Sequence, residues 1–322
     1  MKKLLSLLMV MLLTLSLFVG CGDEPVTPET PTEKDYSLAM GVVVSPALAT
    51  SKVTATVASI VTDADGKIVL CRFDCVDYSA WDKTAGAINT TAPQSKLEQG
   101  DAYDAWQPMA AGRWYQQAGA LENYVVGKTQ AEVAATALNA DGKVTDTDLY
   151  ASCSIAVTDL LGAVDNAFKS EHKVSFKSTA TAFTAGISVV GSVKDTSKEA
   201  TDETPASTNA KYSVTFAGAV LADGKVVASI LDTAEPELIG ITADGAESLS
   251  YKGSKREQGD AYDAWQPMAA GRWYSQADAY SASAVGLTAQ NIDSLKTEGV
   301  AGCTITVTDY KAAIEKAVKA AK

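Results

Sequence analysis

The feature that most constrains this sequence is a block of residues that occurs twice. Residues 98–115 read EQGDAYDAWQPMAAGRWY, and residues 257–274 repeat the same letters without a change. Landmarks on either side keep the same order, with Ala-Asp-Gly-Lys upstream from residues 64 and 222 and Val-Thr-Asp downstream from residues 157 and 307. Self-similarity of this kind predicts two copies of one structural unit. We therefore expect repeats over residues 36–169 and 170–322.

The chain begins with an export signal of the lipoprotein type. Lys2 and Lys3 precede a short apolar run that ends in Gly20 and Cys21. A charged start, a short apolar stretch and a small residue before the cut are typical of an export signal, and a cysteine in this place is where lipid is attached. The alternative, a membrane-spanning helix, needs about 20 apolar residues. We expect removal of residues 1–20 and acylation of Cys21, which would anchor the protein to the outer face of a cell membrane.

Residues 21–35 have the composition of a tether. They are acidic, rich in proline and threonine, and contain almost nothing apolar to bury. The whole chain carries 27 basic and 39 acidic residues, a net charge of −12, and loss of Lys2 and Lys3 would take it to −14. Such a charge argues against nucleic acid as a partner and against a basic face lying on anionic lipid.

The remaining cysteines do not indicate a disulfide framework or a metal site. Cys71 and Cys75 lie four residues apart in an expected strand, so their Cα atoms would be about 13 Å apart, further than a disulfide reaches. Cys153 and Cys303 are expected to be buried, small apolar residues. With one histidine in the chain, His172, and no CxxC motif, a structural zinc site is not expected.

Each repeat is expected to combine a hairpin with helices. Asp-Gly turns at residues 65 and 223 separate apolar runs over 53–61 and 68–76, and over 212–220 and 226–231. Residues 116–137 have helical spacing, and residues 155–157 and 305–307 are expected to be short and extended. Thr-Asp pairs at 158 and 308 are expected to cap a last helix. The prediction is an α+β fold, two tandem repeats of a small antiparallel sheet with helices, after a lipoprotein signal and flexible tether.

The repeated block holds four of the five tryptophans of the chain. One interpretation is that its rings hold a small core together. The other is a pocket lined by rings and a guanidinium, suited to a flat, partly anionic ligand. The side chains concerned are Tyr103, Trp106, Arg113, Trp114 and Tyr115, with their copies Tyr262, Trp265, Arg272, Trp273 and Tyr274.

A second pair of segments follows the block. Residues 298–306 read EGVAGCTIT, and residues 148–156 read DLYASCSIA. Both resemble the flavin-attachment segment of FMN-binding domains, in which an acid precedes a Ser-Gly-Ala-Thr tetrad. In that family a flavin transferase esterifies the threonine hydroxyl with the phosphate of FMN. The preceding Asp-Gly hairpins are similar to the opening strands of the same family.

The resemblance implies specific roles for residues in both segments. Glu298 and Asp148 match the acid, Gly302 matches the glycine, and Thr304 and Ser154 match the acceptor. Ser152 replaces the glycine in the first repeat, so Thr304 is expected to be the better acceptor. A glycine lets the backbone approach a phosphate. The isoalloxazine ring is expected to lie against Trp265 or Trp273, and the corresponding rings of the first repeat are Trp106 and Trp114.

Three functions remain open at this point. The resemblance implies an FMN-carrying lipoprotein of extracellular electron transfer, served by a flavin transferase and by a membrane quinol or NADH dehydrogenase, with the flavin supplying the chemistry. The second is a lipoprotein that binds a planar ligand in its aromatic pockets, and the third is a structural surface lipoprotein. No acid–base pair or nucleophile with a partner is recognisable by spacing, so we expect an electron carrier or binding protein rather than an enzyme acting on a substrate of its own.

Overall fold

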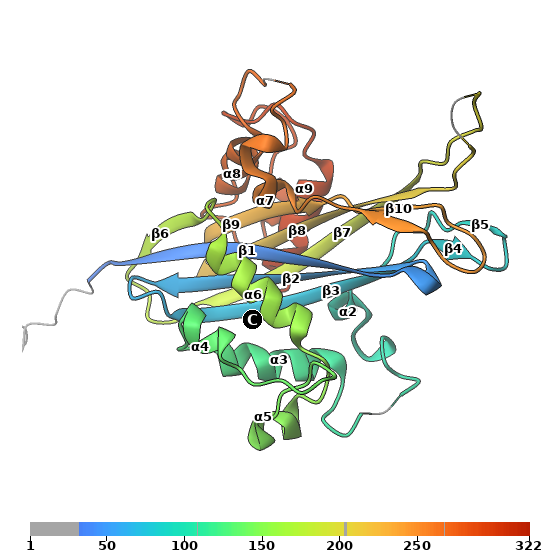
Figure 1. The fold of residues 1–322 in the computed structure, drawn as a ribbon. Coiled ribbons are helices and arrows are strands. Elements are labelled where there is room, and N and C mark those ends of the chain that lie inside the picture. Colours follow the sequence, from blue (N-terminus) through green and yellow to red (C-terminus); the bar gives the residue numbers. More distant parts are fainter. Residues whose placement is uncertain (1–31, 108, 203–204, 267) are drawn as a thin grey trace, which may run out of the picture. The chain divides into compact units, whose positions relative to one another are not determined.

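Long antiparallel strands form the centre of the fold in this computed structural model, which describes residues 32–107, 109–202, 205–266 and 268–322. The first half supplies β1 (Lys34–Ala47), β2 (Lys52–Asp63) and β3 (Ile68–Ser79). The second half supplies β7 (Thr184–Asp195), β8 (Ala210–Ala222) and β9 (Lys225–Ala234). Each set is a three-stranded meander in which the middle strand pairs with both neighbours (Figure 1).

Shorter strands extend both sheets. The first sheet has the order β3-β2-β1-β6, in which β6 (Val174–Ser178) follows the first half in sequence and pairs with β1. In the second sheet β10 (Glu237–Ile239) pairs with the start of β8, and β11 (Ser248–Ser250) pairs with β10. A separate two-stranded ribbon is formed by β4 (Trp81–Asp82) and β5 (Ala87–Ile88).

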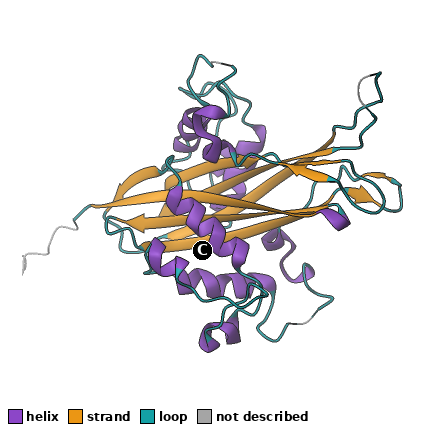
Figure 2. Ribbon diagram, viewed as in Figure 1, coloured by secondary structure: helices purple, strands orange, loops and turns teal. Residues whose placement is uncertain are grey.

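The helices lie on the outer faces of the two sheets (Figure 2). The first half contains η1 (Leu48–Thr50), α2 (Lys96–Gln99), η2 (Gly100–Ala102), α3 (Trp114–Val125), α4 (Gln130–Ala134), α5 (Thr147–Ser152) and α6 (Thr158–Lys169). The second half contains α7 (Lys255–Gln258), η3 (Gly259–Ala261), α8 (Trp273–Ala282), η4 (Ile292–Ser294) and α9 (Thr308–Lys319). Helices α3 and α6 cover the first sheet, and α8 and α9 cover the second.

The two sheets pack face to face and share one core. β3 contacts β7 and β1 contacts β9. Because successive strand residues point to opposite faces, Leu38, Met40 and Val42 enter the core between the sheets, whereas Ala39 packs under the helices of the first half. Residues 33–322 form one compact unit, so burial between the halves stabilises both of them.

Small residues allow each last helix to lie close to its sheet. A Cβ on Gly41 of β1 would overlap the backbone of α6, and a Cβ on Gly186 of β7 would overlap the backbone of α9. Ser188 in β7 donates its hydroxyl to the carbonyl of Ala313 in α9, at 2.6 Å. Close helix–sheet packing in both halves therefore depends on short or absent side chains on β1 and β7.

The predicted α+β class with antiparallel sheets is confirmed, as are both Asp-Gly hairpins. Three details differ. The expected helix over 116–137 is divided into α3 and α4 by Gly127, whose φ is +82°. Residues 155–157 and 305–307 are not strands. Val157 and Val307, rather than the expected Thr-Asp pairs, occupy the N-cap positions of α6 and α9, with no side-chain cap.

The predicted signal, Cys21 and residues 21–31 of the predicted tether lie outside the described residues. The last two tether residues, Lys34 and Asp35, belong to β1. No helix in the described part of the chain has the length and apolar character needed to cross a bilayer. Cys71, Cys75, Cys153 and Cys303 are free thiols, and Cys303 is only partly buried.

Candidate functional site

A buried carboxylate attaches the repeated block to the sheet in each half. Asp74 in β3 accepts the backbone N–H of Cys75 at 2.8 Å and of Leu97 at 3.2 Å. Asp232 in β9 accepts the N–H of Thr233 at 2.7 Å and of Arg256 at 3.1 Å. Burial raises the pKa of Asp74 to about 7, although the hydrogen bonds that its carboxylate accepts act in the opposite direction. Each carboxylate thus positions the first turn of α2 or α7.

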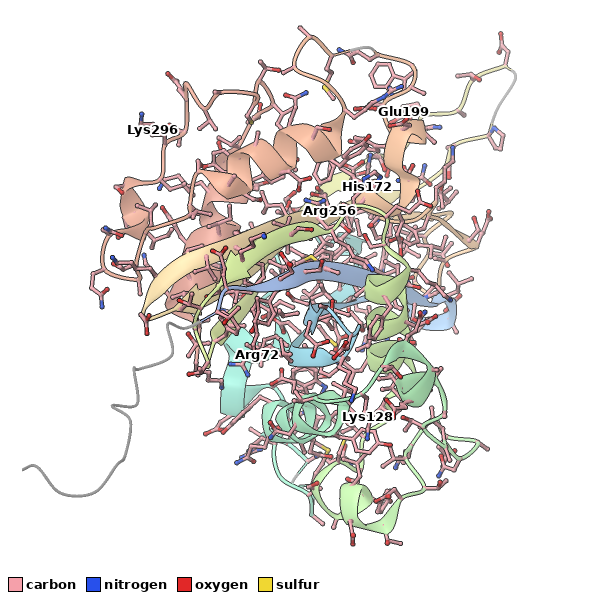
Figure 3. All side chains as sticks on the ribbon, turned by 90° about the vertical axis from the view of Figure 1, so that its left-hand side faces the viewer. Arg72, Lys128, His172, Glu199, Arg256 and Lys296 are labelled. Atoms are coloured by element: carbon pink, nitrogen blue, oxygen red, sulfur yellow. The ribbon has the colours of Figure 1, made fainter. Side chains whose placement is uncertain are left out.

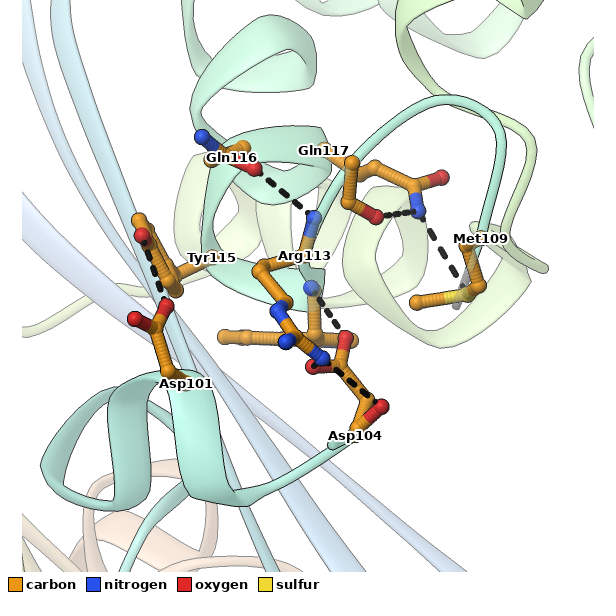
Figure 4. Close-up of polar contacts among 9 residues, drawn as sticks. Asp101, Asp104, Met109, Arg113, Tyr115, Gln116 and Gln117 are labelled. Atoms are coloured by element: carbon orange, nitrogen blue, oxygen red, sulfur yellow. Dashed lines mark hydrogen bonds and ion pairs between the residues drawn. The ribbon is translucent and has the colours of Figure 1, made fainter. Parts of the chain in front are cut away.

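Within the block, a second acid fixes the start of the following helix (Figure 4). Asp104 accepts the N–H of Trp114 at 2.7 Å and a guanidinium N–H of Arg113 at 3.1 Å. Tyr115 donates its hydroxyl to Asp101 at 3.0 Å. In the second half, Asp263 accepts from Trp273 and Arg272, and Asp260 from Tyr274, with the same distances. Satisfying the free N–H groups of a helix start in this way fixes its entry angle.

The block divides its tryptophans between core and surface. Trp114 and Trp273 are 6% and 3% exposed, and the indole N–H of Trp273 donates to the Tyr310 hydroxyl at 2.9 Å. Trp106 and Trp265 are each 79% exposed. The core interpretation is confirmed for the inner pair of rings, whereas the pocket interpretation stays a prediction. Trp114 and Trp273 pack in cores, and Trp106 and Trp265 are available to a ligand.

A lysine accompanies the inner rings in each half, buried in the second and partly buried in the first. The ammonium of Lys255 lies 4.7 Å from the ring centroid of Tyr262 and 5.3 Å from that of Trp273, and it pairs with Glu235 at 3.2 Å. Burial alone lowers the pKa of Lys255, but Tyr310 and Glu235 outweigh it and raise this pKa to about 12. The first half repeats the arrangement with Lys96, Tyr103, Trp114 and Asp77. A cation over aromatic faces is attracted to them, so each lysine stabilises the position of the inner rings.

The predicted acceptor residues lie beside the block. Thr304 donates its backbone N–H and its hydroxyl to the amide oxygen of Gln276, at 2.8 and 2.9 Å. Ser154 makes the same two bonds to Gln117, at 2.8 and 3.2 Å. Both glutamines are fully buried. They are the site residues that sequence reasoning missed, because a glutamine just after the repeated block carries no motif of its own.

A cavity of about 590 Å³ joins the acceptor segment of the second half to the block. Ile305 and Thr306, which follow the acceptor, line it together with Trp265 and Lys255. This volume is within the range of small-molecule sites. The lining carries both charges, because Lys211 and Lys255 pair with Glu235 and Asp263 also lines the cavity.

The remaining residues of the predicted attachment segments differ between the halves. Glu298 and Asp148 are both exposed. Asp148 is in the first turn of α5, whereas Glu298 is in a bend of irregular chain. Gly302 has a φ of +79°, a conformation that favours glycine. Ser152 ends α5 and bonds to the carbonyl of Leu149. The second half therefore keeps an open turn before its acceptor, and the first half has a helix there.

Neither a metal centre nor a relative accounts for the site. Among the described residues, no group of three or more His, Cys, Asp or Glu side chains is placed to hold a metal ion. Comparison of the chain with protein-family models, with curated proteins and with solved structures finds no match.

Proposed function

We propose that the protein is a membrane-anchored, extracytoplasmic flavin carrier, with an FMN site in each half and the better site in the second. The observation that supports this most is the position of the acceptor segment. Thr304 is exposed, its neighbours Ile305 and Thr306 line a cavity, and an exposed indole, Trp265, lines the same cavity. The attachment hydroxyl thus belongs to the residue just before two lining residues of a cavity that also has a flat ring for stacking.

The residues at this cavity suit the isoalloxazine ring of FMN better than its phosphate. Trp265 offers a face to the isoalloxazine, and such stacking contributes about 1 kcal/mol beyond area burial. Trp273 offers little surface, so we assign stacking to Trp265 in the second half and to Trp106 in the first. Lys255 and Lys211 line the same cavity and would supply positive charge to hold the phosphate, although Glu235 partly balances that charge.

The chain's own residues would orient the cofactor rather than react. FMN would supply one- and two-electron transfer. Gln276 holds the acceptor segment through its bond to the Thr304 backbone, a contact that remains when the Thr304 hydroxyl is esterified. The tether and the lipid on Cys21 would keep two such sites near a membrane dehydrogenase, and we propose that electrons pass from it through the flavins to an outside acceptor.

Flavin emission tests the assignment of the stacking ring. The full-length protein is produced with a flavin transferase, purified in detergent, and its emission per bound flavin is compared between wild type, Trp265→Ala and Trp81→Phe. Indole stacking quenches flavin, so Trp265→Ala should be several-fold brighter and Trp81→Phe should match wild type. Equal emission from all three would contradict the assignment of Trp265. Wild type without absorbance in the flavin region would contradict the function, and a planar-ligand-binding lipoprotein would then be the better proposal.

A further inference from the structure

Two further cavities border the repeated block, one at each copy, and both are lined by residues of the two halves. One, of about 520 Å³, lies between Tyr274, Gly259 and the segment that follows α6. The other, of about 750 Å³, lies between Tyr115, Gly100 and the segment that follows α9. In both cavities the tyrosine and the glycine come from the same positions of the repeated block. The two cavities therefore share this part of their lining.

The chain itself places a ring in the smaller cavity. The imidazole of His172 stacks on Tyr274 with centroids 3.8 Å apart and planes inclined by 23°. It lies over Gly259, where a Cβ would be 3.1 Å from its Nε2. Arg256 donates to the main-chain oxygen of His172 at 3.1 Å, which holds the segment in place (Figure 3).

The larger cavity has the same tyrosine and glycine in its lining, but no imidazole stacks on the tyrosine. Tyr115 keeps its bond to Asp101, but among the described residues no aromatic ring stacks on it. Gly119 of α3 lines the cavity, and a Cβ there would meet nothing within 4 Å. The corresponding residue of α8, counted from the block, is Asp278, which pairs with Arg256. The missing side chain at Gly119 is one reason for the larger volume.

A partly buried guanidinium lines the same cavity. Arg72, whose side chain is 14% exposed, donates to Ala185 O at 2.9 Å, to Glu122 at 2.8 Å and to Lys322 O at 3.2 Å. These bonds use three of the five donors of an arginine, so two remain for another acceptor. Both oxygens of Glu122 are already engaged, by Arg72 and by the N–H of Phe73.

We propose that this cavity is a binding site for a small planar aromatic carboxylate. The ring would stack on Tyr115 as His172 stacks on Tyr274, and the carboxylate would accept the remaining donors of Arg72. A charge-assisted bond of this kind contributes more than a neutral one, and the cavity volume suits a one- or two-ring compound. This site is separate from the flavin cavity, which is lined by Trp265 and Ile305.

Calorimetric titration of the full-length protein in detergent with indole-3-carboxylate tests the proposal. Wild type should bind one equivalent, and indole, which lacks the carboxylate, should bind at least tenfold more weakly. Gly119→Leu fills the open space with a better helix former, so it should fold normally and lose the site. His172→Ala uncovers Tyr274 in a cavity that has neither Arg72 nor the open space at Gly119, so this variant should still bind a single equivalent.

The outcomes separate this site from the proposed flavin site. Trp265→Ala, which changes the flavin cavity, should leave the titration unchanged. No binding of indole-3-carboxylate by wild type up to millimolar concentration would overturn the proposal. So would unchanged binding in a Gly119→Leu protein with wild-type thermal unfolding, or a second equivalent in His172→Ala, which would show that Arg72 is not needed.

Discussion

Thr304 gives both its backbone N–H and its hydroxyl to one oxygen, the amide oxygen of Gln276, at 2.8 and 2.9 Å. The amide nitrogen of Gln276 donates in turn to the carbonyl of Gly271 at 2.9 Å. One buried side chain therefore connects the proposed acceptor to the end of the repeated block.

Replacement of Gln276 should loosen the acceptor segment and destabilise the protein. Gln276→Ala leaves the Thr304 N–H and the Gly271 carbonyl without a partner and opens a cavity, which we expect to cost about 2–4 kcal/mol. Urea unfolding measures the loss, and hydrogen exchange at Thr304 should become faster. Ser275→Ala, at the exposed neighbouring position, should stay within about 0.5 kcal/mol of wild type. A Gln276→Ala protein as stable as this control would contradict the role of the amide.

The buried carboxyl of Asp74 should make stability fall as pH rises. Its pKa is raised from 3.8 to about 7 in the folded protein, so the fold favours the protonated form. The stabilising contribution is present in full below about pH 4 and is lost as pH rises through about 7. Its size is at most about 1.4 kcal/mol for each unit by which folding raises the pKa.

Asp74→Asn keeps a neutral acceptor and should remove part of this dependence. We expect the difference in unfolding free energy between pH 5 and pH 8 to be smaller by at least about 1 kcal/mol than in wild type. Asp65→Asn, at an exposed turn position, should follow the wild-type curve. Parallel curves for Asp74→Asn and wild type would show that Asp74 does not titrate in this range.

Close contact between β1 and α6 should make Gly41 intolerant of substitution. The Cβ of Gly41→Ala would overlap the carbonyl of Ala163 and the N–H of Ala167, so the helix must move, and we expect a cost of about 3 kcal/mol. Gly119→Ala, a glycine in α3 with open space around its Cβ, should instead stabilise by about 0.5–1 kcal/mol. Thermal unfolding of the two variants should therefore shift in opposite directions. A shift in the same direction would contradict the packing.

The exposed and buried tryptophans of the repeated block should respond differently to truncation. Trp106→Ala and Trp265→Ala remove rings that are 79% exposed, so each should change the unfolding free energy by less than about 1 kcal/mol. Trp114→Ala removes a core ring and should cost about 3–5 kcal/mol. Chemical denaturation measures all three, and a large loss on removal of Trp265 would mean that this ring belongs to the core.

The sequence predicted the hairpins because Asp-Gly between apolar runs specifies a local turn. It did not reveal β1 and β7. Leu38, Ala39 and Met40 are all buried, since helices cover one face and the other sheet covers the opposite face. A strand buried on both faces lacks the alternation that identifies a strand. The packing of the two sheets on each other depends on contacts between distant residues, and no local pattern encodes it.

The candidate site was predictable to a similar degree. The repeated block and the proposed attachment segments could be picked out from sequence motifs, but the motifs do not say which rings are buried. Trp106 and Trp114 are both in the block, yet Trp106 is in irregular chain where no periodicity assigns a face, and Trp114 begins α3. Gln117 and His172 gain their roles only from residues that are distant in sequence.

Intact-mass measurement of protein made together with an active flavin transferase tests the central proposal most directly. Wild type should carry the mass of one FMN less water, with a second addition at lower yield. Thr304→Ala should lose the main addition, and Ser154→Ala should lose only the minor one. Wild type without any addition, while the same transferase modifies a control substrate, would contradict covalent flavin attachment in this protein.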